Sequence, residues 1–359
     1  MLKNKFLKVG LLLPLTALML AGCSLSLNTG SSSSTGGLND GGVFKSLNKG
    51  ATWAQLSSIQ GVNAKRSFAG VDIISLSLDP SDNKAIYAGS FENGLFYSYD
   101  GALGWQIAAG LGKVSIISVA VDPANKCIIY ATAANKVFKS EDCSRTWAQV
   151  YFDNDLQAII SSLVIDHASS NNIFIGTSNG DIIRSSDKGA SWRALDRVNS
   201  RVDKIVISPV SSKVMFAGTA TKGIFRSVNG GDKWEKMADK LKDFDGSNRF
   251  RDLIIVKSEK ANIFLATDYG LLKSTDDGDT WSKIELLTEE EEAKIYSVAV
   301  DPSDVDQIYY ATGTTFYRSS DGGKNWSSKK LPTSRVGFKL LLDPKNPAIL
   351  YLAARQIKK

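Results

Sequence analysis

The octet STDDGDTW, at residues 274–281, brings together groups that could carry out acid–base chemistry. It holds three carboxylates, at Asp276, Asp277 and Asp279, together with three hydroxyls, a glycine and a tryptophan. A carboxylate within reach of a substrate can act as a general acid or base. The same residues also suit a structural turn, in which the carboxylate accepts hydrogen bonds from backbone N–H groups.

Seven copies of this octet recur along the chain, and each ends in a tryptophan. They are SLNKGATW (46–53), SYDGALGW (98–105), SEDCSRTW (140–147), SSDKGASW (185–192), SVNGGDKW (227–234), STDDGDTW (274–281) and SSDGGKNW (319–326). The chain has seven tryptophans, and they close these copies as Trp53, Trp105, Trp147, Trp192, Trp234, Trp281 and Trp326. Each tryptophan is expected to cover its turn and to fill space between neighbouring structural units.

The third position of the octet tests its role within this one chain. It holds Asn48, Asp100, Asp142, Asp187, Asn229, Asp276 and Asp321. Asparagine accepts the same hydrogen bonds as aspartate but cannot transfer a proton as an acid or base, so hydrogen bonding is the role common to all copies. The fifth position is usually glycine, which adopts positive φ at little cost. Ala102 and Ser144 replace it in copies two and three, where we expect altered turns.

The segments around each octet predict four strands per repeat. A short apolar strand precedes the octet, a second lies before it, and a third often runs into Asp-Pro, while a more polar strand follows the tryptophan. Four strands in about 45 residues are typical of a β-propeller blade. After residue 41 the chain starts with only the third and fourth strands, and it finishes with only the first and second. We therefore predict an all-β fold over residues 41–359, a propeller of seven four-stranded antiparallel blades closed by a split blade.

The N-terminal segment reads as a targeting signal and a tether. Residues 1–22 combine a lysine-rich start with an apolar run too short to span a bilayer, which indicates a signal peptide. The sequence LAGC resembles a bacterial lipobox, which implies cleavage before Cys23 and lipidation of its thiol; an ordinary signal peptide is the alternative. Residues 23–40 are rich in serine and glycine, so we expect a flexible tether. The resemblance implies a lipid-anchored, extracytoplasmic protein of the cell envelope, at the outer membrane if the cell has one.

The net charge argues against a nucleic-acid partner. Removing residues 1–22 removes three lysines and no acids, so the formal charge falls from +6 to +3. That is nearly neutral for so long a chain. His167 is the only histidine, which makes a zinc site or a histidine-based triad improbable. We expect no metal, no cofactor and a monomer.

Cys127 and Cys143 are the two other cysteines of the chain. They lie at the start of one predicted strand and just beyond the next, with the turn near Asn135 midway between them, so antiparallel pairing places them opposite each other. An exported protein meets an oxidising compartment, which favours a disulfide over two free thiols.

The pattern S-x-D-x-G-x-x-W resembles the BNR or Asp-box repeat. Sialidases, two-propeller xyloglucan hydrolases, sortilin-type receptors and photosystem II assembly-factor propellers share this repeat, which is specific for fold and uninformative about function. The resemblance implies that the loops before the innermost strands lie opposite the octets, around the mouth of a central channel. Those loops carry Arg66, Lys113, Arg201, Arg251, Lys294 and Arg335. The six cations are either ordinary loop charges or a ring that binds an acidic partner.

Two functions remain in view. The first is a membrane-tethered binding or assembly scaffold that recognises a protein or polyanionic glycan of the cell envelope through the loop face opposite the octets. The second is a glycoside hydrolase or carbohydrate-binding propeller. Hydrolysis needs two carboxylates flanking the scissile bond. The segment ATDYG (266–270) resembles the acid-bearing loop of xyloglucan hydrolases, which makes Asp268 the best single catalytic candidate, without an identifiable partner.

Overall fold

The computed structural model describes residues 39–61, 66–257 and 260–357, all within one compact unit, Gly36–Lys359. The predicted signal peptide, Cys23 and most of the tether lie outside the described residues. No helix in the described ranges is long and apolar enough to cross a bilayer.

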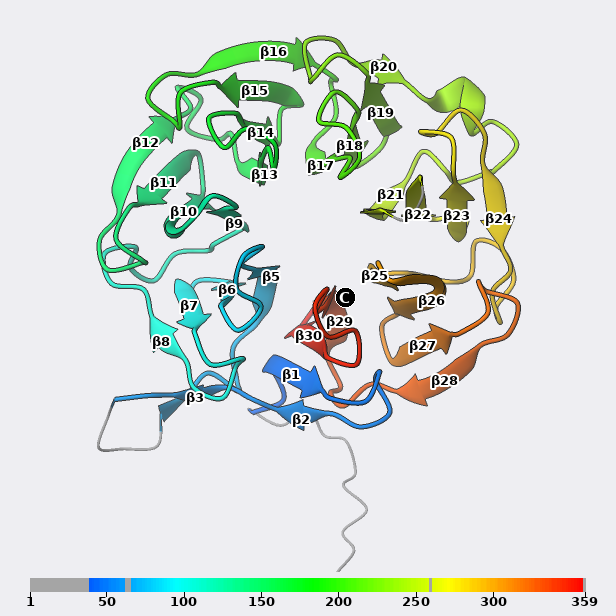
Figure 1. The fold of residues 1–359 in the computed structure, drawn as a ribbon, viewed down its shortest axis with the longest axis horizontal. Helices are drawn as coiled ribbons and strands as arrows, with labels where there is room; N and C mark the ends of the chain where they lie inside the picture. Colours follow the sequence, from blue (N-terminus) through cyan, green and yellow to red (C-terminus); the bar gives the residue numbers. More distant parts are fainter. Residues whose placement is uncertain (1–38, 62–65, 258–259, 358–359) are drawn as a thin grey trace, which may run out of the picture. The chain divides into compact units, whose positions relative to one another are not determined.

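Seven four-stranded antiparallel sheets follow one another around a ring (Figure 1), which confirms the predicted seven-bladed propeller. The first three blades, from the innermost strand outwards, are β5 (Ile73–Leu78), β6 (Ile86–Ser90), β7 (Leu95–Ser98) and β8 (Gln106–Ile107); β9 (Ser118–Asp122), β10 (Asn125–Ala133), β11 (Lys136–Ser140) and β12 (Ala148–Phe152); and β13 (Ile160–Ile165), β14 (Ile173–Thr177), β15 (Asp181–Ser185) and β16 (Arg193–Arg197). The next three are β17 (Val202–Ile207), β18 (Met215–Thr219), β19 (Gly223–Ser227) and β20 (Glu235–Lys236); β21 (Phe250–Lys257), β22 (Ala261–Thr267), β23 (Leu271–Ser274) and β24 (Ser282–Ile284); and β25 (Ser297–Asp301), β26 (Asp304–Ala311), β27 (Thr315–Ser319) and β28 (Ser327–Lys330).

The seventh blade joins the two ends of the described chain. Its sheet order is β2 (Ala54–Gln55), β1 (Gly42–Ser46), β30 (Leu350–Arg355) and β29 (Val336–Leu342), so the inner two strands come from the C-terminal side. Phe44 pairs with Leu352 in the antiparallel ladder between β1 and β30. This split blade, which the sequence predicted, closes the ring by pairing the strands of the two ends, which would otherwise expose their edges.

Apolar side chains pack between neighbouring blades and form the core. The second strand of each blade is almost wholly buried, as in IFIGT of β14 and MFAGT of β18. Several octet tryptophans also contact the preceding blade. The indole N–H of Trp192 donates to the carbonyl of Val150 at 3.1 Å, and the ring of Trp53 packs edge-on against Phe316 at 5.4 Å. These contacts tie the two octets to the blade before them.

Two small elements were not predicted. The hairpin β3 (Ser58–Ile59) and β4 (Arg66–Ser67) lies in the linker between the split blade and the first blade. Ile59 forms a parallel bridge with Trp105, so this linker holds the octet of the first blade. A single 3₁₀ turn, η1 (Ala238–Lys240), lies in the linker after β20.

Most innermost strands carry a β-bulge near their start. The ladder shifts register between Ile73 and Ser75 in β5, and matching shifts occur in β13, β17, β21 and β29. A bulge leaves one residue unpaired and can redirect its side chain. The bulged residues are Ile74, Ser161, Asp203, Arg251 and Phe338, and Ile117 and Tyr296 hold the corresponding positions ahead of β9 and β25. All seven are partly exposed, so we refer to them as the bulge ring.

Candidate functional site

Each octet is a hydrogen-bonded clasp between the third and fourth strands of its blade. In STDDGDTW, the Ser274 hydroxyl donates to Asp276 Oδ1 at 2.8 Å and accepts from the Gly278 N–H at 3.0 Å. Asp276 Oδ1 also accepts from the Thr280 N–H at 2.9 Å. The carboxylate thus accepts a hydrogen bond from the N–H four residues later, and the serine hydroxyl accepts one from the N–H of the glycine between them. Equivalent bonds occur in all seven copies.

The aspartates of the octets are held in the ionised state. Hydrogen bonds from the Thr146 side chain and backbone lower the pKa of Asp142 to about 2. Bonds from Ser191 lower the pKa of Asp187, and bonds from Asn325 lower the pKa of Asp321, each to about 2. A carboxyl group with so low a pKa has no proton to donate at neutral pH. In the copies with asparagine, Asn48 Oδ1 accepts from the Thr52 N–H at 2.8 Å in the same way.

The expectation of altered turns in copies two and three is wrong. The fourth and fifth positions of every octet have positive φ, including Ala102 (+72°) and Ser144 (+68°). Ala102 and Ser144 donate their N–H groups to the octet serines at 3.0 and 2.9 Å, just as the glycines do. The clasp and its flanking strands therefore impose the left-handed backbone even where the residue type disfavours it.

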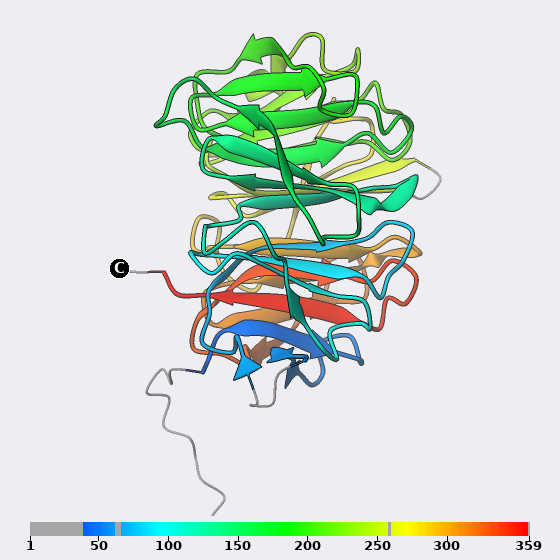
Figure 2. The same cartoon turned by 90° about the vertical axis from the view of Figure 1, so that its left-hand side faces the viewer.

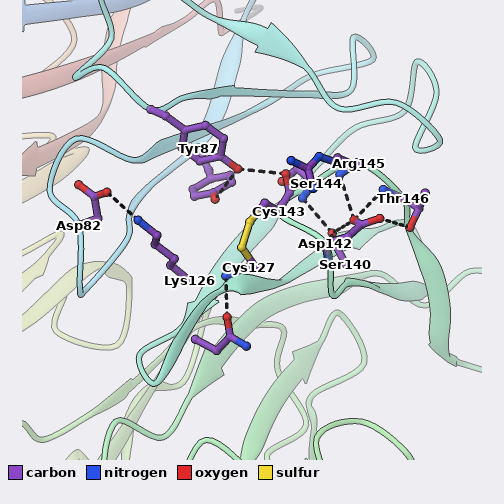
Figure 3. The surroundings of a disulfide bond; sticks show 12 residues. Asp82, Tyr87, Lys126, Cys127, Ser140, Asp142, Cys143, Ser144, Arg145 and Thr146 are labelled. Carbon is purple, nitrogen blue, oxygen red and sulfur yellow. Dashed lines mark hydrogen bonds and ion pairs between the residues drawn. A yellow bond between two sulfur atoms is a disulfide. The ribbon is translucent and has the colours of Figure 1, made fainter.

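Cys127 and Cys143 form a disulfide that joins β10 to the octet of the second blade (Figure 3). The Cys143 N–H donates to the Cys127 carbonyl at 3.1 Å, so the two residues meet at the end of the hairpin. Tyr87 of the neighbouring blade lies on the Ser144 side of this disulfide in Figure 3. The position indicates a structural role.

Three of the six predicted loop cations are neutralised within the protein. Arg201 pairs with Asp203, Arg251 with Asp268, and Arg335 with Asp72, the last at 2.6 Å. The other three, Arg66, Lys113 and Lys294, are exposed. The loop face therefore does not carry a ring of six free cations. Two of these ion pairs involve Asp203 and Asp72, which the sequence analysis did not consider, and the third engages the catalytic candidate Asp268.

A charged network lies on the inner strands of the fourth and fifth blades. Asp252 is buried and accepts from Lys204 Nζ at 2.7 Å, from the Ser297 hydroxyl at 3.1 Å and from the Val298 N–H at 3.0 Å. Burial alone would raise the pKa of Asp252, but the charges of Lys204 and Lys339 and these hydrogen bonds outweigh it and hold the pKa below its usual range. Asp252 is therefore an anion that bridges three successive blades.

Lys339 faces this network from the seventh blade. Burial lowers the pKa of Lys339, and the charges of Asp252, Lys204, Asp203 and Arg355 also act on that pKa. Lys204 and Asp203 belong to the fourth blade, which is not adjacent to the seventh, so these interactions cross the centre of the ring (Figure 1). Lys339 Nζ lies 5.4 Å and Arg355 Cζ 4.6 Å from the centroid of the Phe338 ring. The centre of the ring is thus charged on blades four, five and seven.

The bulge ring is apolar on the first two blades, where it holds Ile74 and Ile117. The centre of the ring therefore presents an apolar side and a charged side. Sequence reasoning missed Lys204, Asp252, Lys339 and Arg355. The signal for Lys204, Asp252 and Lys339 was a charged residue inside an otherwise apolar innermost strand, as in VDKIVI and VGFKLLL, whereas Arg355 ends the second strand of its blade.

A separate groove of about 640 Å³ lies between β23, β24 and the linker that follows, and its lining begins at Tyr269, the residue after the hydrolase candidate Asp268. Its lining includes Tyr269, Lys283, Leu287 and Glu290. Lys283 Nζ contacts Glu290 at 3.0 Å, and the Tyr269 hydroxyl donates to the same carboxylate at 2.8 Å. The described residues contain no group of three or more histidine, cysteine or acidic side chains placed to hold a metal ion.

The ring of blades, which Figure 2 shows from the side, and the seven clasps define an Asp-box, or BNR-type, seven-bladed β-propeller. A family model described as photosynthesis system II assembly factor YCF48 matches residues 207–337. This match and the structural matches described next confirm the expected resemblance to assembly-factor and xyloglucanase propellers. A comparison with curated protein sequences found no match.

Solved structures share the fold at low sequence identity. The GH74 enzyme of Niastella koreensis matches with a TM-score of 0.63 and 16% identity, over 87% of this chain and 53% of that one. The chain thus spans about half the length of that enzyme. A structure of YCF48 bound to D1 peptide matches with a TM-score of 0.58 and 15% identity, over 80% and 94% of the two chains. The extracellular domain of a putative one component system from B. thetaiotaomicron matches with a TM-score of 0.58 and 14% identity, over 80% and 42%. An assembly factor, hydrolases and the extracellular domain of a putative one component system therefore share this architecture, and at this identity the likeness shows the fold alone.

Proposed function

We propose that this protein is a lipid-tethered, extracytoplasmic binding or assembly scaffold that recognises an acidic partner through the loop face opposite the octets. The observation that carries this proposal is that the octets and the opposite end of the ring differ in the polar groups that they leave available for a partner. The octets are occupied by structural hydrogen bonds, whereas the opposite end of the ring leads to charged side chains at its centre. The LAGC sequence and the tether at residues 23–40 support attachment to an envelope membrane through Cys23.

Complex formation by a structural neighbour supports the same proposal. YCF48, which this chain resembles in fold, has been solved bound to D1 peptide. The exposed Arg66, Lys113 and Lys294 give the loop face positive charge that can steer an acidic partner towards the ring.

Charge reversal on one face tests the proposal. Cells producing the full-length protein would be crosslinked, and the captured envelope partner quantified, for a variant with Arg66→Glu, Lys113→Glu and Lys294→Glu. A matched control reverses three exposed lysines on the octet face, Lys84→Glu, Lys213→Glu and Lys324→Glu. We expect the loop-face variant to lose capture and the control to keep it. Equal capture by both variants, or loss only in the control, would refute recognition through the loop face.

A glycan-directed function is the second candidate, because the groove lined by Tyr269, the residue after Asp268, has the size of a ligand site and contains an aromatic side chain. Asp268 itself accepts a hydrogen bond from Arg251 Nε, which ties up one carboxylate oxygen. Asp252 is ionised and cannot serve as the general acid at neutral pH. Hydrolysis of a defined envelope glycan by the wild type, abolished by Asp268→Asn, would establish this function over the first.

A further inference from the structure

We propose that the centre of the ring binds a carboxylate of an acidic, extended polypeptide segment, with Lys339 and Arg355 as the anion-binding groups. This inference rests on the proposed function and deepens it, since it names the chemical group that is recognised. Lys339 lies on β29 and Arg355 ends the adjacent β30, so one blade presents both cations.

The charges of Lys339 and Arg355 are not neutralised by a close ion pair. Lys204, Arg251 and Arg335 each lie against a carboxylate: Asp252, Asp268 and Asp72, respectively. Within the described ranges, neither Lys339 nor Arg355 has a carboxylate oxygen at ion-pair distance. The charge of Asp72 raises the pKa of Arg355 against the effect of burial, but the Asp72 carboxylate accepts from Arg335 and from the Gln356 N–H. Two partly desolvated cations without a paired anion attract an anionic ligand.

The two cations are also held in place before a ligand arrives. Phe338 is the bulged residue between Gly337 and Lys339, and its partly exposed ring lies near both cations. Across the ring, the Lys204–Asp252 pair is fixed by the Ser297 hydroxyl and the Val298 N–H. Asp252 therefore stays engaged with its own partners and leaves Lys339 free to bind another anion. A site arranged in advance loses less side-chain entropy on binding.

The surroundings favour a single carboxylate over a multiply charged phosphate group. Asp203 and Asp252 act electrostatically on Lys339 and would repel a dianion. Phe338, Ile74 and Ile117 supply apolar surface in the bulge ring. A peptide carboxylate flanked by an aliphatic or aromatic residue matches this combination of two cations and apolar side chains.

A selection from random peptides with free C-termini tests the inference without knowledge of the natural partner. Full-length protein in detergent would be the bait, and the most enriched peptide would be fluorescently labelled to measure its Kd by anisotropy. We expect enrichment of acidic peptides with an adjacent apolar residue. Lys339→Gln and Arg355→Gln should each weaken binding about 10- to 100-fold, since each removes a charge-assisted contact. Amidation of the peptide carboxylates should abolish binding.

Matched controls separate this site from general effects of surface charge. Lys213→Gln and Lys324→Gln remove exposed cations of the octet face and should change Kd less than about twofold. Lys339→Arg should retain binding, and unchanged thermal unfolding would show that each variant is folded. Absence of enrichment, binding insensitive to Lys339 and Arg355, or equal competition by inorganic phosphate would each overturn the carboxylate site. The capture experiment on the loop face would still decide the proposed function independently.

Discussion

The clasp geometry predicts that the acidic position of an octet tolerates loss of its charge but not loss of its hydrogen bonds. In the octet at 274–281, the perturbations are Ser274→Ala, Asp276→Asn and Asp276→Ala. Ser274 is buried and accepts the Gly278 N–H in a buried bond. The Ser274→Ala variant leaves that N–H without its acceptor, which costs about 1–3 kcal/mol of unfolding free energy.

Asp276→Asn should cost less than about 1 kcal/mol, because another copy already shows how asparagine serves there. Asn48 Oδ1 accepts from the Ser46 hydroxyl at 3.0 Å and from the Thr52 N–H at 2.8 Å, and its Nδ2 donates to Thr52 Oγ1 at 2.9 Å. Asp276→Ala removes the acceptor altogether and should cost about 1–3 kcal/mol.

Urea unfolding of the full-length protein, followed by tryptophan fluorescence, measures these differences at neutral pH. The reasoning requires Asp276→Asn to lie close to the wild type, with Ser274→Ala and Asp276→Ala clearly less stable. If Asp276→Asn were as destabilising as Asp276→Ala, the negative charge itself would be needed, and the hydrogen-bonding account of the octet would be refuted.

Three further predictions concern stability. Lys188 has a left-handed backbone (φ +58°), so Lys188→Gly should raise the unfolding free energy by up to about 1 kcal/mol. Gly189→Ala, at φ +90°, should lower the unfolding free energy. Thermal unfolding that gave the opposite order of stability would contradict this explanation. The pKa values of Asp142, Asp187 and Asp321 are about 2 when folded and about 3.9 when unfolded, so their stabilisation is complete above about pH 4 and is lost as the pH falls through about 2. A triple Asp→Asn variant at these positions should therefore lose less stability than the wild type between those pH values, and equal acid sensitivity in the two proteins would refute the linkage. The disulfide Cys127–Cys143 closes a loop with a sequence separation of 16, so the double variant Cys127→Ser, Cys143→Ser should have an unfolding free energy lower by up to about 3 kcal/mol. Two reactive thiols in the denatured, unreduced wild type would show that the disulfide does not form.

The propeller could be predicted from the sequence because its signals are local and repeated. The strand periodicity and the Ser and Trp positions of the octet recur in every blade, and the half-blades at the two ends require the closing sheet. The left-handed turns at Ala102 and Ser144 were not anticipated, because residue preference was weighed without the serine hydrogen bonds that hold the backbone.

The charged centre of the ring could not be predicted because it depends on contacts between residues of different blades that lie far apart in sequence. Arg335 and its partner Asp72 are 263 positions apart in sequence, and Lys204 and Asp252 meet across two blades. The register of a bulged strand also decides whether a residue such as Phe338 is paired or partly exposed. The loop charges alone therefore could not show which three of the six cations are paired in the structure.

Site-specific photocrosslinking in living cells tests most directly the claim that recognition occurs through the loop face and the centre of the ring. A photoreactive residue would replace Phe338 at the centre of the ring, or Val228, which is 59% exposed within an octet. The account predicts a discrete partner adduct from position 338 that is lost when Lys339→Gln is added, and no such adduct from position 228. An adduct formed only from position 228 would contradict it.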